Sequence, residues 1–159
     1  MKRWRPTYTV MDRLMASPSA PMPQTKAQHQ LLRMYQALRA LETAAAPTPD
    51  DWRVVSDAVN LMETLVQMGH ASDASGLLQD AVAALSVAGA RHVDEGKPIR
   101  LSGPGMQAVR GVLADYREAL DTLPARVIIE THRLTEQRVH ELLQGRGRPG
   151  DVQIVERAK

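Results

Sequence analysis

The stretch that decides the fold is TPDDWRVVSDAVNLMETLVQMG, residues 48–69. Thr48 can cap a helix, Pro49 suits its first turn, and the two aspartates that follow oppose the positive end of the helix dipole. Apolar side chains then recur at helical spacing, and Gly69 is a typical helix end. The stretch therefore predicts an amphipathic helix whose buried face is formed by Trp52, Val55, Val59, Met62 and Val66.

Similar patterns on both sides of this stretch predict further helices. They cover about 23–45, about 72 to just before Gly96, about 102–123, and 125 to about 144, with Pro124 as a break. Residues 97–101 are too short for a helix and could pair with 152–155 as a two-stranded ribbon. The sequence thus predicts an all-α fold, a single-domain bundle of four to five helices, with the minor β ribbon as an open alternative.

The predicted helices divide the chain into three parts. Residues 1–22 form a basic N-terminal arm rich in proline, residues 23–145 the helical bundle, and residues 146–159 a C-terminal loop and tail. Within the arm, a short amphipathic turn is expected to dock on the bundle through Val10, Met11, Leu14 and Met15.

Composition supports a helical core and a reducing environment. The 159 residues are 43% hydrophobic but only 3% aromatic, and phenylalanine and cysteine are absent. A core of Leu, Val, Ala and Met suits helices better than strands, and disulfides or thiolate metal sites are excluded. The sequence contains no apolar run near the ~20 residues that cross a bilayer. A cytoplasmic protein without a membrane span is therefore expected.

Charge is unevenly distributed although the net charge is only +2. Residues 1–41 hold seven Lys or Arg and one Asp, a net +6, whereas residues 42–125 hold six basic and twelve acidic residues, a net −6. Residues 126–159 return to a net +2. Separated charge of this kind allows one surface to attract a polyanion while the whole molecule stays near neutral.

The segment ARVIIETHRLTEQRVHELLQG, residues 125–145, carries the most informative pattern. Leu134 could close a turn and Thr135 could cap a second helix, with Ile128, Val139 and Leu142 on the inner side. This segment and the loop after it, residues 125–149, resemble the helix-turn-helix of small bacterial and phage repressors. The resemblance implies a DNA-binding protein.

If the motif forms, its second helix presents Glu136, Gln137, Arg138 and Glu141 to the groove. The predicted contacts are Gln137 and Arg138 at base edges, with Arg146 and Arg148 at phosphates. The family usually has glycine in the turn, where this chain has Arg133. The alternative is one uninterrupted amphipathic helix from Ala125 to Leu143.

Two further segments could contact nucleic acid. Arg146-Gly147-Arg148-Pro149 resembles the core of an AT-hook, which binds the minor groove, although a simple helix end followed by a polar turn is the favoured interpretation. In the arm, the cations Lys2, Arg3 and Arg5 flank the aromatic ring of Trp4. This segment could lie along the phosphates of a nucleic acid, or it could fold back on the body.

Catalytic and metal-binding patterns are not apparent in the sequence. His132, Glu136 and His140 share a helix face, but the two histidines lie ~12 Å apart at 1.5 Å per residue, too far to hold one ion. The sequence shows no nucleophile–base set and no phosphate-binding loop. We therefore expect a protein that is not an enzyme and needs no metal or cofactor.

These observations favour DNA or a nucleoprotein complex as the partner. Residues 47–66 and 123–143 also resemble uncharacterised small proteins of proteobacterial plasmids and phages, which implies an accessory protein of a mobile genetic element. The rival hypothesis is an adaptor, or an inhibitor of a host defence complex, that binds a host protein through the acidic middle helices. A homodimer is a third possibility.

Overall fold

A computed structural model of the chain describes residues 6–146, and these form an all-helical body. No strand occurs among the described residues. The helices are α1 (Val10–Met15), α2 (Gln24–Thr43), α3 (Pro49–Gln67), α4 (Leu77–Glu95), α5 (Gly103–Thr122) and α6 (Ala125–Leu143). None of the helices in this part of the chain is both long and apolar enough to cross a membrane.

The predicted helix ends are largely confirmed. Thr48 and Asp51 form a reciprocal capping box at the start of α3, and the Ser102 hydroxyl accepts from the Gly105 N–H at the start of α5. Gly69 and Gly96 adopt positive φ just after α3 and at the end of α4. At both places a left-handed residue is needed to end a helix, and glycine adopts that conformation at no steric cost.

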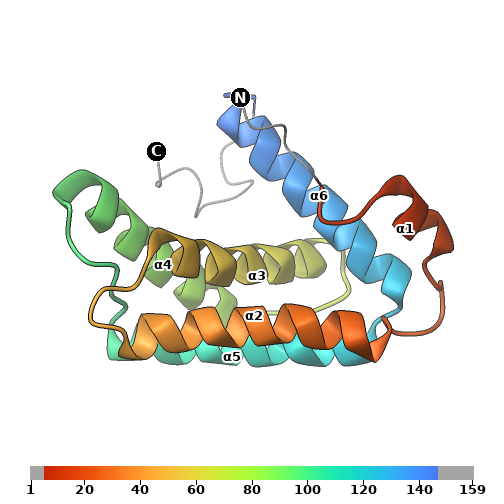
Figure 1. Cartoon of the computed structure of the whole chain (residues 1–159), viewed down its shortest axis with the longest axis horizontal. Coiled ribbons are helices and arrows are strands. Elements are labelled where there is room, and N and C mark those ends of the chain that lie inside the picture. Colours follow the sequence, from red (N-terminus) through yellow and green to blue (C-terminus); the bar gives the residue numbers. More distant parts are fainter. Residues whose placement is uncertain (1–5, 147–159) are drawn as a thin grey trace.

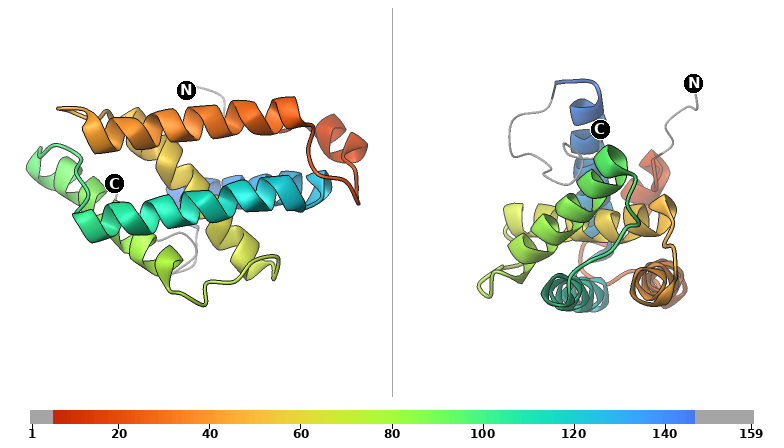
Figure 2. Two further views of the ribbon diagram at one scale, coloured as in Figure 1. Left: turned by 90° about the horizontal axis from the view of Figure 1, so that it is seen from below. Right: turned by 90° about the vertical axis from the view of Figure 1, so that its left-hand side faces the viewer.

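The helices pack in two layers around α3 (Figures 1 and 2). Helices α2 and α5 run side by side in opposite directions, and α3 crosses over them. Helix α4 packs mainly against α5, while α6 lies on the other side of α3 and its C-terminal half projects from the body. Because α3 contacts α2, α4, α5 and α6, it is the central helix of the body.

The core is made of aliphatic side chains, as the composition indicated. The largest side chains that are fully buried are leucines, valines and isoleucines from α3, α4, α5 and α6, together with Ile99 from the α4–α5 connection. Burial of each such side chain contributes ~1.5–3 kcal/mol, so this shared core holds the helices together. Trp52 links α3 to α4 by a hydrogen bond, in which its indole N–H donates to the Leu85 carbonyl at 3.0 Å.

A polar seam joins α3 to α6. The hydroxyls of Thr64 and Thr135 lie 2.6 Å apart, so one of them donates to the other. The hydroxyl that accepts donates its own proton to a carbonyl one turn back in its helix, that of Asn60 for Thr64 or that of Thr131 for Thr135. Thr131 extends the seam with a 3.6 Å contact to the Met68 sulfur. All three threonines are buried, and their hydroxyls have partners, so the seam does not carry the cost of an unpaired polar group.

Three details of the predicted fold are corrected. The described residues form six helices rather than four to five, because residues 10–15 of the arm are a helix with its own capping box between Thr9 and Asp12. Residues 97–101 form no strand, since Ile99 is buried in the core and Arg100 donates to the Ala45 carbonyl. The other half of the expected ribbon, 152–155, lies outside the described residues.

The third correction concerns how the arm docks. The apolar side chains of α1, which were expected to face the bundle, are instead 64–78% exposed. The arm is held by residues on either side of α1, namely the half-buried Tyr8 and the buried Ala16 and Met22. Helix α1 itself contacts α6, where Arg13 lies 3.9 Å from Glu130, but the buried apolar contacts of the arm come from its flanking residues.

Candidate functional site

The outer face of α2 carries cations and no carboxylate of its own. Helix α2 turns Ala27, Met34, Leu38 and Leu41 toward the core, which leaves the opposite side to solvent. Residues 24–41 contain no Asp or Glu, so that side carries cations and neutral groups alone. We call this surface the basic face; its charged or titratable members are Lys26, His29, Arg33 and Arg39, all exposed.

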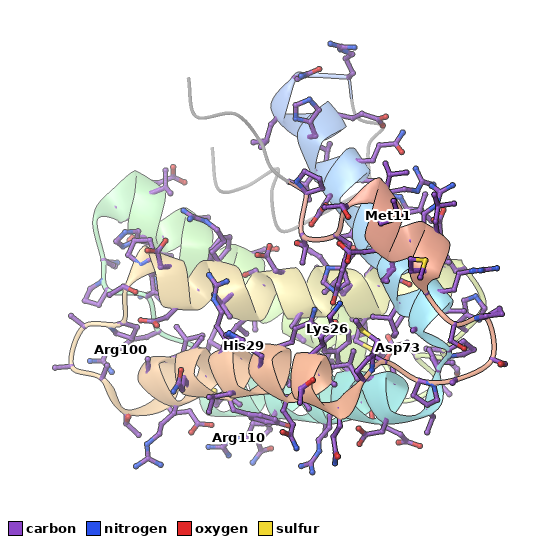
Figure 3. All side chains as sticks on the ribbon, turned by 45° about the vertical axis from the view of Figure 1, so that its right-hand side comes forward. Met11, Lys26, His29, Asp73, Arg100 and Arg110 are labelled. Atoms are coloured by element: carbon purple, nitrogen blue, oxygen red, sulfur yellow. The ribbon has the colours of Figure 1, made fainter. Side chains whose placement is uncertain are left out.

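Few of these cations are neutralised within the molecule. Lys26 lies 3.9 Å from Asp12 of α1, and both Lys26 and His29 project from α2 in Figure 3. Arg33 and Arg39 form no ion pair within residues 6–146. The first carboxylate after the basic face is Glu42, and Arg110 of α5 pairs with it at 2.5 Å. Among the described residues, Lys26 thus has one ion pair and Arg33 only a longer-range interaction with Asp57, so the basic face keeps part of its positive potential.

Helix α2 is also accessible. It occupies an edge of the two-layer body, as its end-on view in Figure 2 shows. A 20-residue helix is ~30 Å long, comparable with one turn of a DNA duplex. Exposed glutamines at 24, 28 and 36 add hydrogen-bonding groups between the cations.

A groove lies next to the basic face, between α2, α3 and α6. Its volume is about 440 Å³. Most of the surface area that lines the groove is apolar, and its principal apolar residues are Met34, Val54, Ala58, Leu61 and Val139. Its polar residues are Thr7, Gln30, Arg33, Arg53, Asp57, Tyr116, His132, Thr135 and Glu136. Arg33 belongs to both the groove and the basic face.

Asp57 is the electrostatically unusual group of the groove. Many protein atoms surround its carboxylate although water still reaches it, and this crowding raises the pKa of Asp57 to about 6. The cations Arg53 and Arg33 act against the increase, whereas Glu136 adds to it. Asp57 therefore titrates near pH 6, above the usual range of an aspartate.

His132 occupies the inner end of the groove and is almost fully buried. Its Nε2 lies 3.3 Å from the Tyr116 hydroxyl, and its ring packs edge-on against Tyr8 with centroids 5.0 Å apart. Burial lowers the pKa of His132 to about 4, so the imidazole is neutral at physiological pH. Burial also raises the pKa of the Tyr116 hydroxyl. The ring contact between Tyr8 and His132 anchors the arm to α6. With a pKa of about 4, His132 is not a general base that titrates near neutral pH.

The helix predicted to carry DNA contacts is straight. Residues 125–143 form the single helix α6, so the backbone between Thr131 and Thr135 is helical and the turn of a helix-turn-helix is not present there. Arg133, at the position where that family has glycine, has an ordinary negative φ and pairs with Glu130 at 2.5 Å. The uninterrupted amphipathic helix that the sequence left open is the form that occurs.

The predicted base-edge residues are engaged within α6 or with α3. The Gln137 amide donates to Glu141 at 2.9 Å and accepts from Arg133, and the Arg138 guanidinium donates to Gln67 of α3. Arg146 is exposed beyond the end of α6, which projects away from α2 (Figure 1). Lys2, Arg3, Trp4, Arg5 and Arg148 lie outside the described residues. The structure therefore does not bring Arg138 or Arg146 together with the basic face.

Other kinds of site find no support among the described residues. No group of three or more His, Asp or Glu in residues 6–146 is arranged to hold a metal ion. No family model matches the chain, and no curated protein or solved structure is detectably similar to it. The absence of acidic residues from 24 to 41 is visible in the sequence and could have identified the basic face. The groove could not be foreseen, because its lining comes from five separate segments.

Proposed function

We propose that the protein is a non-enzymatic DNA-binding protein whose principal contact surface is the basic face of α2. The observation that carries this proposal is an accessible helix of 20 residues whose outer side holds Lys26, Arg33 and Arg39 without a carboxylate between them. Phosphate contacts of this kind supply most of the affinity of a DNA-binding protein and release bound counterions.

The glutamines on the basic face suit a helix placed in the major groove. This groove is wide enough for an α-helix, and Gln and Arg side chains can form paired hydrogen bonds with base edges there. The phosphate contacts position the protein, and any sequence preference would come from Gln28, Arg33 or Gln36. An accessory role in a mobile genetic element is part of the same proposal and rests only on the resemblance to plasmid and phage proteins.

Fluorescence anisotropy with a labelled duplex tests the proposal. Affinity is measured at several salt concentrations for the full chain and for the double variant Arg33→Gln/Arg39→Gln. If both cations neutralise phosphates, the slope of log affinity against log salt becomes shallower by about 1.8. The matched control is Arg91→Gln/Arg117→Gln, which removes two exposed cations from α4 and α5.

Three outcomes separate the possibilities. A shallower slope in the α2 variant alone supports the basic face. Equal slopes in both variants would show that DNA contacts lie elsewhere, and a variant lacking residues 2–5 then tests the arm predicted from the sequence. No binding of the unmodified protein to duplex at low salt would overturn the proposal.

The rival function, a protein-binding adaptor or inhibitor, has one supporting observation. Asp115 of α5 has a raised pKa through partial burial and through the nearby carboxylates of Glu118 and Asp73. These like charges repel one another, and a basic partner surface would relieve that repulsion. Nuclease-treated lysate distinguishes the two functions, because a stoichiometric partner that is lost in Asp115→Asn/Glu118→Gln but retained in Arg33→Gln/Arg39→Gln would favour the rival.

A further inference from the structure

Helix α1 turns its apolar side to solvent. Apolar residues occupy four of its six positions, and at 100° per residue they cover about 140° of its circumference. The exposed fractions are 76% for Val10, 64% for Met11, 65% for Leu14 and 78% for Met15. Single exposed apolar side chains are ordinary on a protein surface, whereas several adjoining ones with polar groups around them are typical of an interaction site.

The polar side of α1 is the side that contacts the protein. Arg13 lies 3.9 Å from Glu130 of α6, and Asp12 lies 3.9 Å from Lys26 of α2. At the end of the helix, Arg126 of α6 donates to the C-cap carbonyl of α1 at 3.3 Å. These contacts hold α1 with its apolar side outward, which is the reverse of the usual orientation of an amphipathic helix on a globular protein.

The charges on and around α1 are mainly positive. In the described chain, the cations that belong to α1, contact it or line the pocket between it and α6 are Arg13, Lys26, Arg126 and Arg133, against the carboxylates of Asp12, Glu130 and Glu136. Lys2, Arg3 and Arg5 precede α1 in the sequence, so the region has seven cations against three carboxylates, a net +4. An apolar patch within a positive region is complementary to a surface that is both apolar and anionic.

We infer that the apolar side of α1 inserts into the surface of a bilayer that contains anionic phospholipids. The apolar side chains enter the boundary between headgroups and acyl chains, while the surrounding cations meet lipid phosphates. The small size of the patch favours a bilayer over a second copy, because a stable protein interface takes about 20–30 residues a side. The inference concerns α1 and does not depend on DNA binding.

Cosedimentation of the full chain with lipid vesicles tests the inference. Vesicles of phosphatidylcholine and phosphatidylglycerol in equal parts should bind the protein about tenfold or more tightly than vesicles of phosphatidylcholine alone, and salt should weaken the binding. Met11→Gln/Leu14→Gln should lower affinity for the anionic vesicles about tenfold or more, because it removes two inserting side chains.

The matched control is Val87→Gln/Val93→Gln, which replaces two exposed apolar residues of α4. Its affinity for the anionic vesicles should stay within about twofold of that of the unmodified protein. Circular dichroism checks that both double variants are folded.

A measurement on the unmodified protein locates the inserted residues. The full chain with ¹³C-labelled methionine methyls is bound to small bicelles of the anionic composition that contain a lipid spin-labelled in its acyl chain. The signals of Met11 and Met15 should broaden. Met34 and Met62, which are 3% and 5% exposed in the core, should keep their line widths.

Several results would overturn the inference. They are no cosedimentation with anionic vesicles at low salt, equal affinity for the two kinds of vesicle, full affinity in Met11→Gln/Leu14→Gln, and unchanged Met11 and Met15 signals on the bicelles. A dimer that Met11→Gln/Leu14→Gln abolishes would assign the patch to a second copy instead. This variant keeps the cations of the basic face, so its salt dependence on duplex DNA should be unchanged and the two proposals fail separately.

Discussion

The indole ring of Trp52 fills the space that a side chain at Gly89 would need. A Cβ atom added to Gly89 would lie 2.8 Å from Cζ2 of Trp52, closer than real Cβ contacts allow. The same ring donates its N–H to the Leu85 carbonyl of α4, so it cannot move aside without breaking that hydrogen bond. The close approach of α3 to α4 thus depends on a glycine within a helix.

We predict that Gly89→Ala destabilises the protein by about 1–3 kcal/mol through overpacking, although alanine is the better helix former by about 1 kcal/mol. Urea unfolding measures this effect. The matched control is Gly111→Ala in α5, where the added Cβ meets the Leu77 side chain, its terminal Cδ1 at 3.0 Å and its Cγ at 4.0 Å. That flexible end can shift, so Gly111→Ala should be neutral or stabilising by up to about 1 kcal/mol. Equal losses in both variants would contradict the role given to Trp52.

Asp57 should make stability depend on pH in a defined direction. Its pKa is raised to about 6 in the folded protein from an ordinary value of 3.8, so the unfolded chain holds fewer protons between these two values. Its contribution to stability is therefore lost as pH rises through about 4 to 6. Asp57→Asn should be more stable than the unmodified protein above pH 6, and the difference should disappear near pH 4.

Chemical unfolding at pH 4, 5, 6 and 7.5 tests this prediction for Asp57. Asp94→Asn provides the comparison, because Asp94 is exposed on α4 and away from the groove lining. A stability difference for Asp57→Asn that stays constant across this pH range would show that crowding of the charge is not its cause.

His132 should act in the opposite sense. Its pKa falls from 6.5 to about 4 on folding, so the unfolded chain holds more protons in that window and stability is lost as pH falls from 6.5 toward 4. The full effect is on the order of 3 kcal/mol. Because Asp57 opposes it, the clearest measurement compares Asp57→Asn with Asp57→Asn/His132→Gln. The second protein should show the flatter pH profile, while a double variant carrying His29→Gln instead should not.

The arm should be held by residues outside α1. Replacing Met11 and Leu14 with glutamine should change the unfolding free energy by less than about 0.5 kcal/mol, because these side chains are already exposed. Met22→Ala should cost about 2 kcal/mol or more, since that side chain is buried and contacts the Tyr8 hydroxyl through its sulfur. The reverse ranking would show that α1 packs on another surface in solution.

The helix ends could be predicted from the sequence because they depend on interactions between residues close together in the chain. The capping residues Thr48 and Ser102 and the terminal glycines Gly69 and Gly96 act within one helical turn, and each marks a helix end in the structure. The start of α4 was predicted too early, near Ser72-Asp73. The helix begins at Leu77, and Asp73 caps it from outside by accepting from the Leu78 N–H at 2.9 Å.

Features that depend on distant contacts were not accessible in this way. The amphipathic pattern of residues 10–15 does not specify which side of that helix the bundle covers. The prediction that its apolar side packs on the bundle is wrong, because that side is exposed. The groove brings Asp57 together with Arg33, Tyr116 and Glu136, which are 24 to 79 positions away along the chain. No spacing rule links such residues, because crossing angles between helices decide which side chains meet.

The threonine pair between α3 and α6 has a consequence for the direction in which α6 points. An entirely aliphatic contact would permit one helix to slide along the other by a turn, since one leucine can replace another in a ridge. Directional hydroxyl pairing at Thr64 and Thr135 favours a single alignment, because a shift of about 5.4 Å would break the hydrogen bond between the two buried hydroxyls. The Thr64–Thr135 hydrogen bond thus fixes the register of α6 on α3, and with it the orientation of the C-terminal end of α6 beyond the body.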